Sequence, residues 1–184
     1  MPEKQRIQLS KAELEQFSRI RRLSQLQSMD PIAFEKYIGY LYERDGYTAY
    51  MTVTSGDEGV DLFLQRGRKT AVVQCKRYAS TVGQPVVRDL YGAMIHNKAN
   101  EAMLVTSGNI SRQAEEWVQD KPIQLIDGHE VIGWARRVRM SGGGLSQTWR
   151  IAIGVTMGIV LCSLLIAGGL FFNTYRERTA GEPL

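Results

Sequence analysis

The chain has 184 residues, a formal net charge of +4 and two cysteines, Cys75 and Cys162. This length fits one ordinary globular domain with some additional chain, and the many aromatic and β-branched residues exclude a wholly disordered protein. Two cysteines in unlike surroundings exclude a disulfide framework and a cysteine-rich zinc site, which fits a reducing compartment. The mild positive charge is compatible with a polyanionic partner without identifying one.

Residues 1–28 are expected to form an N-terminal helix. Ser10 and Glu13 have the spacing of a capping box, and apolar residues follow at helical spacing to about residue 27. A second helix is predicted to begin after Asp30, which can cap it, and to carry Pro31 at its first position. Gly46 is expected to end this helix.

The spacing of the apolar residues then changes from a helical period to the period of strands. Helices are predicted again after Pro85, Ser111 and Gly128. Strands are predicted at residues 47–53, 60–65, 70–77, 102–106 and 123–127. Three strands followed by strand–helix–strand crossovers predict an α/β fold with one mixed central sheet flanked by helices.

The C-terminal part of the sequence has a different composition. Residues 141–149 read as a Gly-rich linker, and residues 151–172 contain no charged side chain. A bilayer needs about 20 apolar residues, so we predict a single transmembrane helix over residues 150–173, followed by a short tail over residues 174–184. A buried core helix is the competing interpretation, but this run shows no polar periodicity.

The arginines that flank this run predict its orientation and its compartment. They are more numerous on its N-terminal side, which places the larger part of the chain in the cytoplasm, anchored to the inner (cytoplasmic) membrane. Within the run, Gly154 and Gly158 form a GxxxG pattern, which can pair two membrane helices and so suggests a homodimer.

Polar residues interrupt the second and third predicted strands. A two-residue type II′ turn at Gly67 and Arg68 would place Asp61 opposite Gln74. Because side chains alternate along a strand, Lys76 would then share one face with both. A turn that is one residue longer would break this alignment. A carboxylate and an amide oxygen suit Mg²⁺, and an adjacent ammonium can stabilise phosphorane charge, so this patch predicts phosphodiester hydrolysis.

The sequence around these residues resembles the Mrr-like type IV restriction endonuclease domain, a branch of the PD-(D/E)xK nucleases in which Gln replaces the acid before xK. The resemblance covers about residues 29–137, and residues 29–140 are therefore assigned to this domain. It rests on an ordered set of motifs: FE at 34–35, GY at 46–47, GDEGVDL at 56–62, VQCKRY at 73–78, VRDLYGA at 87–93, LVTSG at 104–108 and LIDG at 125–128.

The resemblance implies roles for several residues. Asp61, Gln74 and the backbone carbonyl of Cys75 would bind Mg²⁺ or Mn²⁺, and Lys76 would orient the attacking water. Glu35 would complete the acidic cluster, although an exposed acid on an amphipathic helix is its alternative interpretation. Apart from the resemblance, the basic and aromatic character of Arg77, Tyr78 and Arg88 suggests a surface that binds the phosphates of double-stranded DNA, with solvated surface charge as the alternative interpretation.

These expectations together describe a membrane-anchored, Mg²⁺-dependent DNA endonuclease that acts in restriction of, or defence against, foreign DNA. The alternative is a catalytically inactive DNA-binding module of the same fold that is tethered to the membrane. A structural or signalling membrane protein is a third class. Cleavage, or salt-sensitive binding without cleavage, separates the first two classes.

Overall fold

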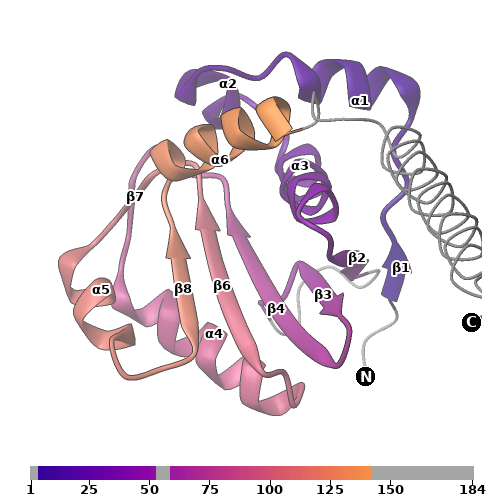
Figure 1. Ribbon diagram of the computed structural model, residues 1–184. Coiled ribbons are helices and arrows are strands. Elements are labelled where there is room, and N and C mark those ends of the chain that lie inside the picture. The colour runs from indigo at the N-terminus through magenta and orange to yellow at the C-terminus, as the bar shows by residue number, and fades with distance from the viewer. Residues whose placement is uncertain (1–3, 53–58, 142–184) are drawn as a thin grey trace, which may run out of the picture. The chain divides into compact units, whose positions relative to one another are not determined.

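The computed structural model describes residues 4–52 and 59–141 (Figure 1). The chain divides into two units, residues 1–142 and 143–184, and the second unit lies outside the described residues. The predicted membrane helix at 150–173 and its GxxxG pattern are therefore not described. Within residues 4–52 and 59–141, no helix is long and apolar enough to cross a bilayer.

A six-stranded mixed sheet forms the centre of the described unit, as predicted. Its strand order is β1-β2-β3-β4-β6-β8, with antiparallel pairing from β1 to β4 and parallel pairing from β4 through β6 to β8. The strands are β1 (Lys4–Arg6), β2 (Thr48–Thr52), β3 (Leu62–Arg66), β4 (Lys69–Lys76), β6 (Glu101–Thr106) and β8 (Ile123–Ile126). A separate two-stranded sheet pairs β5 (Thr81–Val82) with β7 (Asn109–Ile110).

Helices cover both faces of the sheet, and each face buries its own apolar cluster (Figure 1). One face carries α1 (Lys11–Ser18), α2 (Leu23–Gln27), α3 (Pro31–Arg44) and α6 (Gly128–Ser141). The other face carries α4 (Gln84–His96) and α5 (Arg112–Val118). We call these the α3 face and the α4 face. Two separate cores on one sheet are the arrangement expected of helices packed on both sides.

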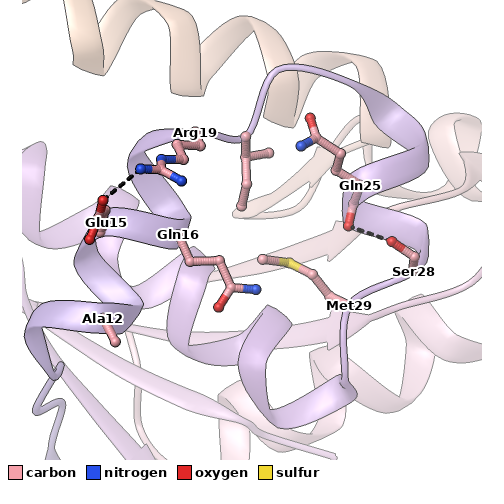
Figure 2. Close-up of a pocket in the computed structure, with 8 residues that line it drawn as sticks. Ala12, Glu15, Gln16, Arg19, Gln25, Ser28 and Met29 are labelled. Carbon is pink, nitrogen blue, oxygen red and sulfur yellow. Dashed lines mark hydrogen bonds and ion pairs between the residues drawn. The ribbon is translucent and has the colours of Figure 1, made fainter.

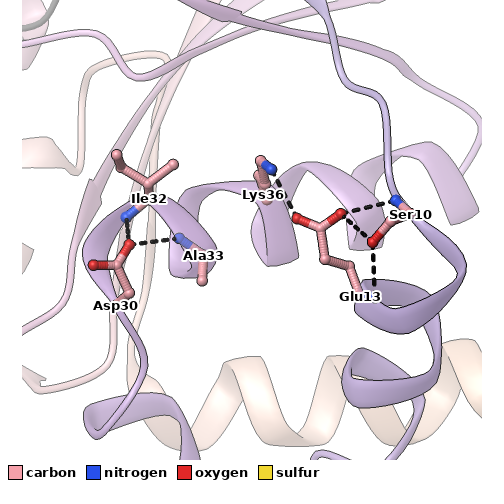
Figure 3. Close-up of polar contacts among 6 residues, drawn as sticks. All are labelled: Ser10, Glu13, Asp30, Ile32, Ala33 and Lys36. Carbon is pink, nitrogen blue, oxygen red and sulfur yellow. Dashed lines mark hydrogen bonds and ion pairs between the residues drawn. The ribbon is translucent and has the colours of Figure 1, made fainter.

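The capping signals in the sequence are confirmed. The Ser10 hydroxyl accepts a hydrogen bond from the backbone N–H of Glu13, whose carboxylate accepts one from the Ser10 N–H and pairs with Lys36 on α3 at 2.7 Å (Figure 3). The Asp30 carboxylate accepts hydrogen bonds from the Ile32 N–H and the Ala33 N–H at the start of α3 (Figure 3). The capping box therefore also fixes α1 against α3.

The single helix predicted for the N-terminal segment is wrong, because the chain turns between α1 and α2. The Gln25 side-chain oxygen accepts hydrogen bonds from the Arg21 N–H and the Arg22 N–H, in place of the backbone oxygens of a continuous helix. The turn allows Ile20 to be buried at 3% exposure, whereas Leu14, on α1, is 42% exposed.

Three short strands were not predicted. β1 lies at the sheet edge and pairs with β2, which is far away in sequence, and its three side chains are all exposed. β5 and β7 have two residues each. None of the three has a run of alternating apolar residues long enough to indicate a strand, so only their tertiary pairing defines them.

Candidate active site

The β3–β4 hairpin has the predicted register along most of its length. Leu62 pairs with Val73, and the pairing continues to Arg66 and Lys69 beside the turn. Gly67 has φ +62°, and Arg68 is not among the residues with positive φ. A positive φ at the first central residue alone is the pattern of the type II′ turn that the sequence predicted.

The register breaks at Asp61, so the prediction that Asp61 lies opposite Gln74 is wrong. The Asp61 N–H donates to the Val73 carbonyl at 2.9 Å, although Val73 is already paired with Leu62. Two residues thus lie opposite one, which is a β-bulge. Consistent with this, Val60 packs in the α4-face cluster and Leu62 in the α3-face cluster, whereas regular alternation would place both on one face.

The bulge redirects the Asp61 carboxylate to the backbone of β4. Its Oδ2 atom accepts a hydrogen bond of 2.6 Å from the Cys75 N–H. The Asp61 carboxylate therefore takes the place of the next backbone acceptor in the β3–β4 hydrogen-bond ladder. This bond holds the acid at the end of β4 that carries Gln74 and Lys76. Burial raises the pKa of Asp61, opposed by the Cys75 hydrogen bond and the charge of Lys76.

Gln74 is buried on β4 with one polar atom unsatisfied. Its side chain is 5% exposed, and its Oε1 atom has no hydrogen-bond partner within the described part of the chain. A Cβ atom at Gly59 would lie 2.8 Å from the Gln74 Nε2 atom, and Gly59 has φ +65°. Glycine at position 59 therefore leaves the space that the amide occupies. Cys75 alternates into the α3-face core, as predicted for a structural thiol.

Glu35 on α3 lies beside the same group. Burial raises its pKa to about 7, the negative charges of Asp61 and then Asp30 add to this effect, and the positive charge of Lys76 opposes it. The two acids and Lys76 are thus close enough for each to act on the others, although no ion pair joins them in the described ranges. From the sequence, Asp30 was expected only to cap a helix, and the effect of its charge on the pKa of Glu35 was not predicted.

These groups fit a divalent cation of the magnesium type. Two partly buried carboxylates repel each other, and the buried Gln74 oxygen has no partner among residues 4–52 and 59–141, so a bound cation would relieve both penalties. Across residues 4–52 and 59–141, no set of three or more His, Cys, Asp and Glu side chains could hold a metal. The site would therefore need the Gln74 amide and the Cys75 carbonyl beside Asp61 and Glu35.

A buried hydroxyl network supports the end of β4. The Lys76 carbonyl accepts hydrogen bonds from the Thr106 hydroxyl at 2.7 Å and the Ser107 N–H at 3.1 Å. Thr106 and Ser107 are both fully buried. From the sequence, this segment was noted only as part of the LVTSG motif, and its support of β4 was not predicted. The signal for this structural role was the pair of hydroxyl residues at the end of a buried strand.

The three predicted DNA-contacting residues lie in different environments. The Arg77 guanidinium donates to the Gln27 carbonyl at 3.1 Å and is half-buried, so it ties β4 to α2. Tyr78 is 46% exposed, and Arg88 on α4 is exposed. Tyr78 and Arg88 are therefore accessible to a ligand, whereas Arg77 is at least partly structural.

A protein-family model described as "Restriction endonuclease" matches residues 26–135. Among curated proteins, the chain is similar to the type IV methyl-directed restriction enzyme EcoKMrr of Escherichia coli strain K12. The two are 28% identical over 119 residues, which covers 60% of this chain and 39% of the relative. The chain thus spans about two fifths of the length of the curated relative that it matches.

Among solved structures, the chain is similar to the DNA modification-dependent restriction endonuclease AspBHI. The TM-score is 0.50 at 20% sequence identity, over 70% of this chain and 36% of that one. An identity this low supports a common fold and nothing about function. The mixed sheet with helices on both faces is therefore the architecture of restriction endonucleases.

Proposed function

The chain belongs to the restriction endonuclease family, and we propose that it is a metal-dependent endonuclease that hydrolyses phosphodiester bonds of double-stranded DNA in restriction of foreign DNA. One observation carries this proposal. The bulge at Asp61 brings its carboxylate to the end of β4 that carries Gln74 and Lys76, beside the Glu35 carboxylate. These are the residue types that metal-assisted phosphodiester hydrolysis uses.

Each side chain has a role that follows from its surroundings. Asp61, Gln74, the Cys75 carbonyl and Glu35 would hold Mg²⁺ or Mn²⁺. When bound, such an ion lowers the pKa of water and stabilises negative charge on phosphate. The Lys76 ammonium, which forms no ion pair among the described residues, is available to hold a water and stabilise the charge of the transition state. Glu35, with a pKa of about 7, can accept or release a proton at its carboxylate near neutral pH.

The proposal includes a membrane anchor at residues 150–173. It is supported by the uncharged run at residues 151–172 and by the excess of arginines on its N-terminal side. The nuclease unit would then face the cytoplasm at the inner membrane, where it can reach DNA. Pairing of two chains through Gly154 and Gly158 would place two active sites in one assembly, one for each DNA strand.

Plasmid cleavage by the full chain tests the proposed function. In detergent or lipid, we expect nicked and linear products with Mg²⁺ or Mn²⁺ and none with a chelator. Asp61→Asn should abolish cleavage, whereas Asp120→Asn, at an exposed acid, should leave it unchanged. If the chain binds DNA in a salt-sensitive way but never cuts it, the inactive DNA-binding module is the better description.

A further inference from the structure

Two arginines from separate elements meet at one backbone oxygen. The Arg21 Nη1 atom, from the connection between α1 and α2, donates to the Ile20 carbonyl at 3.0 Å. The Arg139 Nη1 atom, near the end of α6, donates to the same carbonyl at 2.8 Å. Arg21 Nη1 also donates to the Ser18 carbonyl, so neutral backbone oxygens hold the two guanidinium groups close together.

Arg136 adds a third positive charge to this group. It lies one helical turn before Arg139 on α6 and is exposed. Burial lowers the pKa of Arg139, and the charges of Arg21 and Arg136 lower it further. Guanidinium groups do not lose their proton at physiological pH, so this group of three stays charged and self-repelling.

Among the residues that the structure describes, no Asp or Glu forms an ion pair with Arg21, Arg136 or Arg139. The nearby Arg19 is different, because its guanidinium pairs with Glu15 at 2.6 Å at the rim of the pocket between α1 and α2 (Figure 2). Two guanidinium groups that meet at one carbonyl, with the Arg136 charge one helical turn away, favour an external anion, and guanidinium groups match phosphate geometry well.

The charges of Arg21 and Arg139 act on Tyr37, whereas those of Asp61, Asp30 and Lys76 act on Glu35. Arg139 and Arg21 both act on the phenol of Tyr37, where they oppose the rise in its pKa. Tyr37 follows Glu35 by two positions on α3, and each helical position turns by about 100°, so their side chains lie on opposite sides of the helix. Arg21 and Arg139 therefore act on the side of α3 that carries Tyr37, not on the side that carries Glu35.

The path of the chain points to a membrane surface. α6 ends at Ser141, and the uncharged run begins at residue 151. A connection of this length spans at most about 30 Å when fully extended. Met140, beside Arg139, is 71% exposed, which adds an apolar side chain to the same end of α6. Basic residues next to a membrane anchor attract acidic phospholipids.

We propose that Arg21, Arg136 and Arg139 form a binding site for the phosphate of acidic phospholipids. The site holds the end of α6 and the α1–α2 connection against the membrane surface. It orients the nuclease unit so that Glu35, on the opposite side of α3, remains accessible to DNA. The inference rests on the proposed anchor at residues 150–173.

Hydrogen exchange of the full chain in lipid nanodiscs tests the site. One set of discs contains phosphatidylcholine alone, and the other contains phosphatidylcholine mixed with phosphatidylglycerol. We expect a several-fold slowing of exchange at residues 18–22 and 136–141 in the acidic discs only. Arg136→Gln should remove most of the slowing; it breaks no hydrogen bond in the described ranges, so its effect does not reflect unfolding. Arg112→Gln, on exposed α5, is the matched control.

Two results would overturn the proposed site. The first is an equal rate of exchange at residues 18–22 and 136–141 in both kinds of disc. The second is slower exchange there on addition of a DNA duplex instead of acidic lipid. Flotation with vesicles separates the site from the anchor. If the chain floats only with acidic vesicles, and Arg136→Gln abolishes this flotation, the result supports the phosphate site and rejects the anchor. If the chain floats with neither kind of vesicle, the result rejects both the phosphate site and the anchor.

Discussion

Individual residues at the end of the β3–β4 hairpin determine what this fold can do. The Asp61 carboxylate accepts a hydrogen bond from the Cys75 N–H, and the charge of Asp61 acts on the nearby Glu35. The Gln74 oxygen is buried with no partner in the part of the chain that the structure describes. Such an arrangement costs stability in the free protein, because buried like charges and unsatisfied oxygens are unfavourable. Costs of this kind are typical of functional sites, and the proposed metal site would account for this one.

The raised pKa of Glu35 predicts a dependence of stability on pH. Its folded pKa of about 7 lies above the ordinary value of 4.5, so the folded protein binds more protons between these values and loses stability as pH rises through them. We expect metal-free wild type to lose about 1–3 kcal/mol between about pH 4.5 and 7.5 relative to Glu35→Gln. Urea unfolding at several pH values measures this difference.

The control for this comparison is Glu116→Gln, which changes an exposed acid paired with Arg112. Its stability should follow the pH dependence of the wild type. Parallel curves for wild type and Glu35→Gln would show that Glu35 is ordinary and solvated. Saturating Mg²⁺ should reduce the loss in the wild type, because a bound cation favours the ionised acid.

At the scale of elements, much of the fold could be predicted from the sequence. Alternating apolar residues indicated the strands of the mixed sheet, and the caps at Ser10, Asp30 and Ser111 marked real helix starts. The glycine at position 67 fixed the register from Leu62 to Arg66. These features are local, so local sequence encodes them.

The features that could not be predicted depend on contacts between residues far apart in sequence or on single irregular residues. The bulge at Asp61 adds one residue to a strand without any change in composition, yet it moves the carboxylate out of the predicted face. The break after α1 depends on the Gln25 amide, and β1 exists only through pairing with β2. The residues that motif resemblance assigned to the site lie near one another at the end of β4, but the geometry of Asp61 could not be predicted from the motifs.

Substitutions at two glycines of the hairpin region can distinguish the effect of backbone strain from the effect of a displaced Gln74 side chain. Gly59 and Gly67 both have positive φ, but only a Cβ at Gly59 would meet Gln74, whereas nothing lies within 4 Å of one at Gly67. We expect each substitution by Ala to lower the free energy of unfolding by about 1–2 kcal/mol. Only Gly59→Ala should also reduce cleavage. Equal loss of cleavage in both variants would mean that hairpin stability, not the Gln74 position, limits activity.

At the scale of the whole molecule, the proposal combines a nuclease unit with the predicted anchor at residues 150–173. If residues 150–173 span the bilayer, the full chain should stay with membranes during alkaline extraction, because an apolar helix does not leave the bilayer with peripheral proteins. A chain truncated after Ser141 should be released. Fractionation and immunoblotting compare the two. Release of the full chain would reject the anchor without affecting the nuclease proposal.

Pairing of membrane helices is a separate property of the whole chain. Gly154→Ile should abolish crosslinked dimers, because a large side chain prevents close approach of two backbones. Chemical crosslinking in membranes measures the dimer yield, with Ala167→Ile as a control outside the GxxxG pattern. An unchanged yield for Gly154→Ile would leave the helix as an anchor alone.

The most direct test of the nuclease assignment compares Lys76→Ala with Lys11→Ala in the full chain. Lys76 lies at the end of β4 beside Asp61 and Glu35, whereas Lys11 is exposed at the start of α1. The rate of DNA cleavage with Mg²⁺ should fall by about 10²-fold or more in Lys76→Ala, with DNA affinity nearly unchanged, and stay at the wild-type level in Lys11→Ala. Undiminished cleavage by Lys76→Ala would contradict the assigned site and place the chemistry elsewhere in the protein.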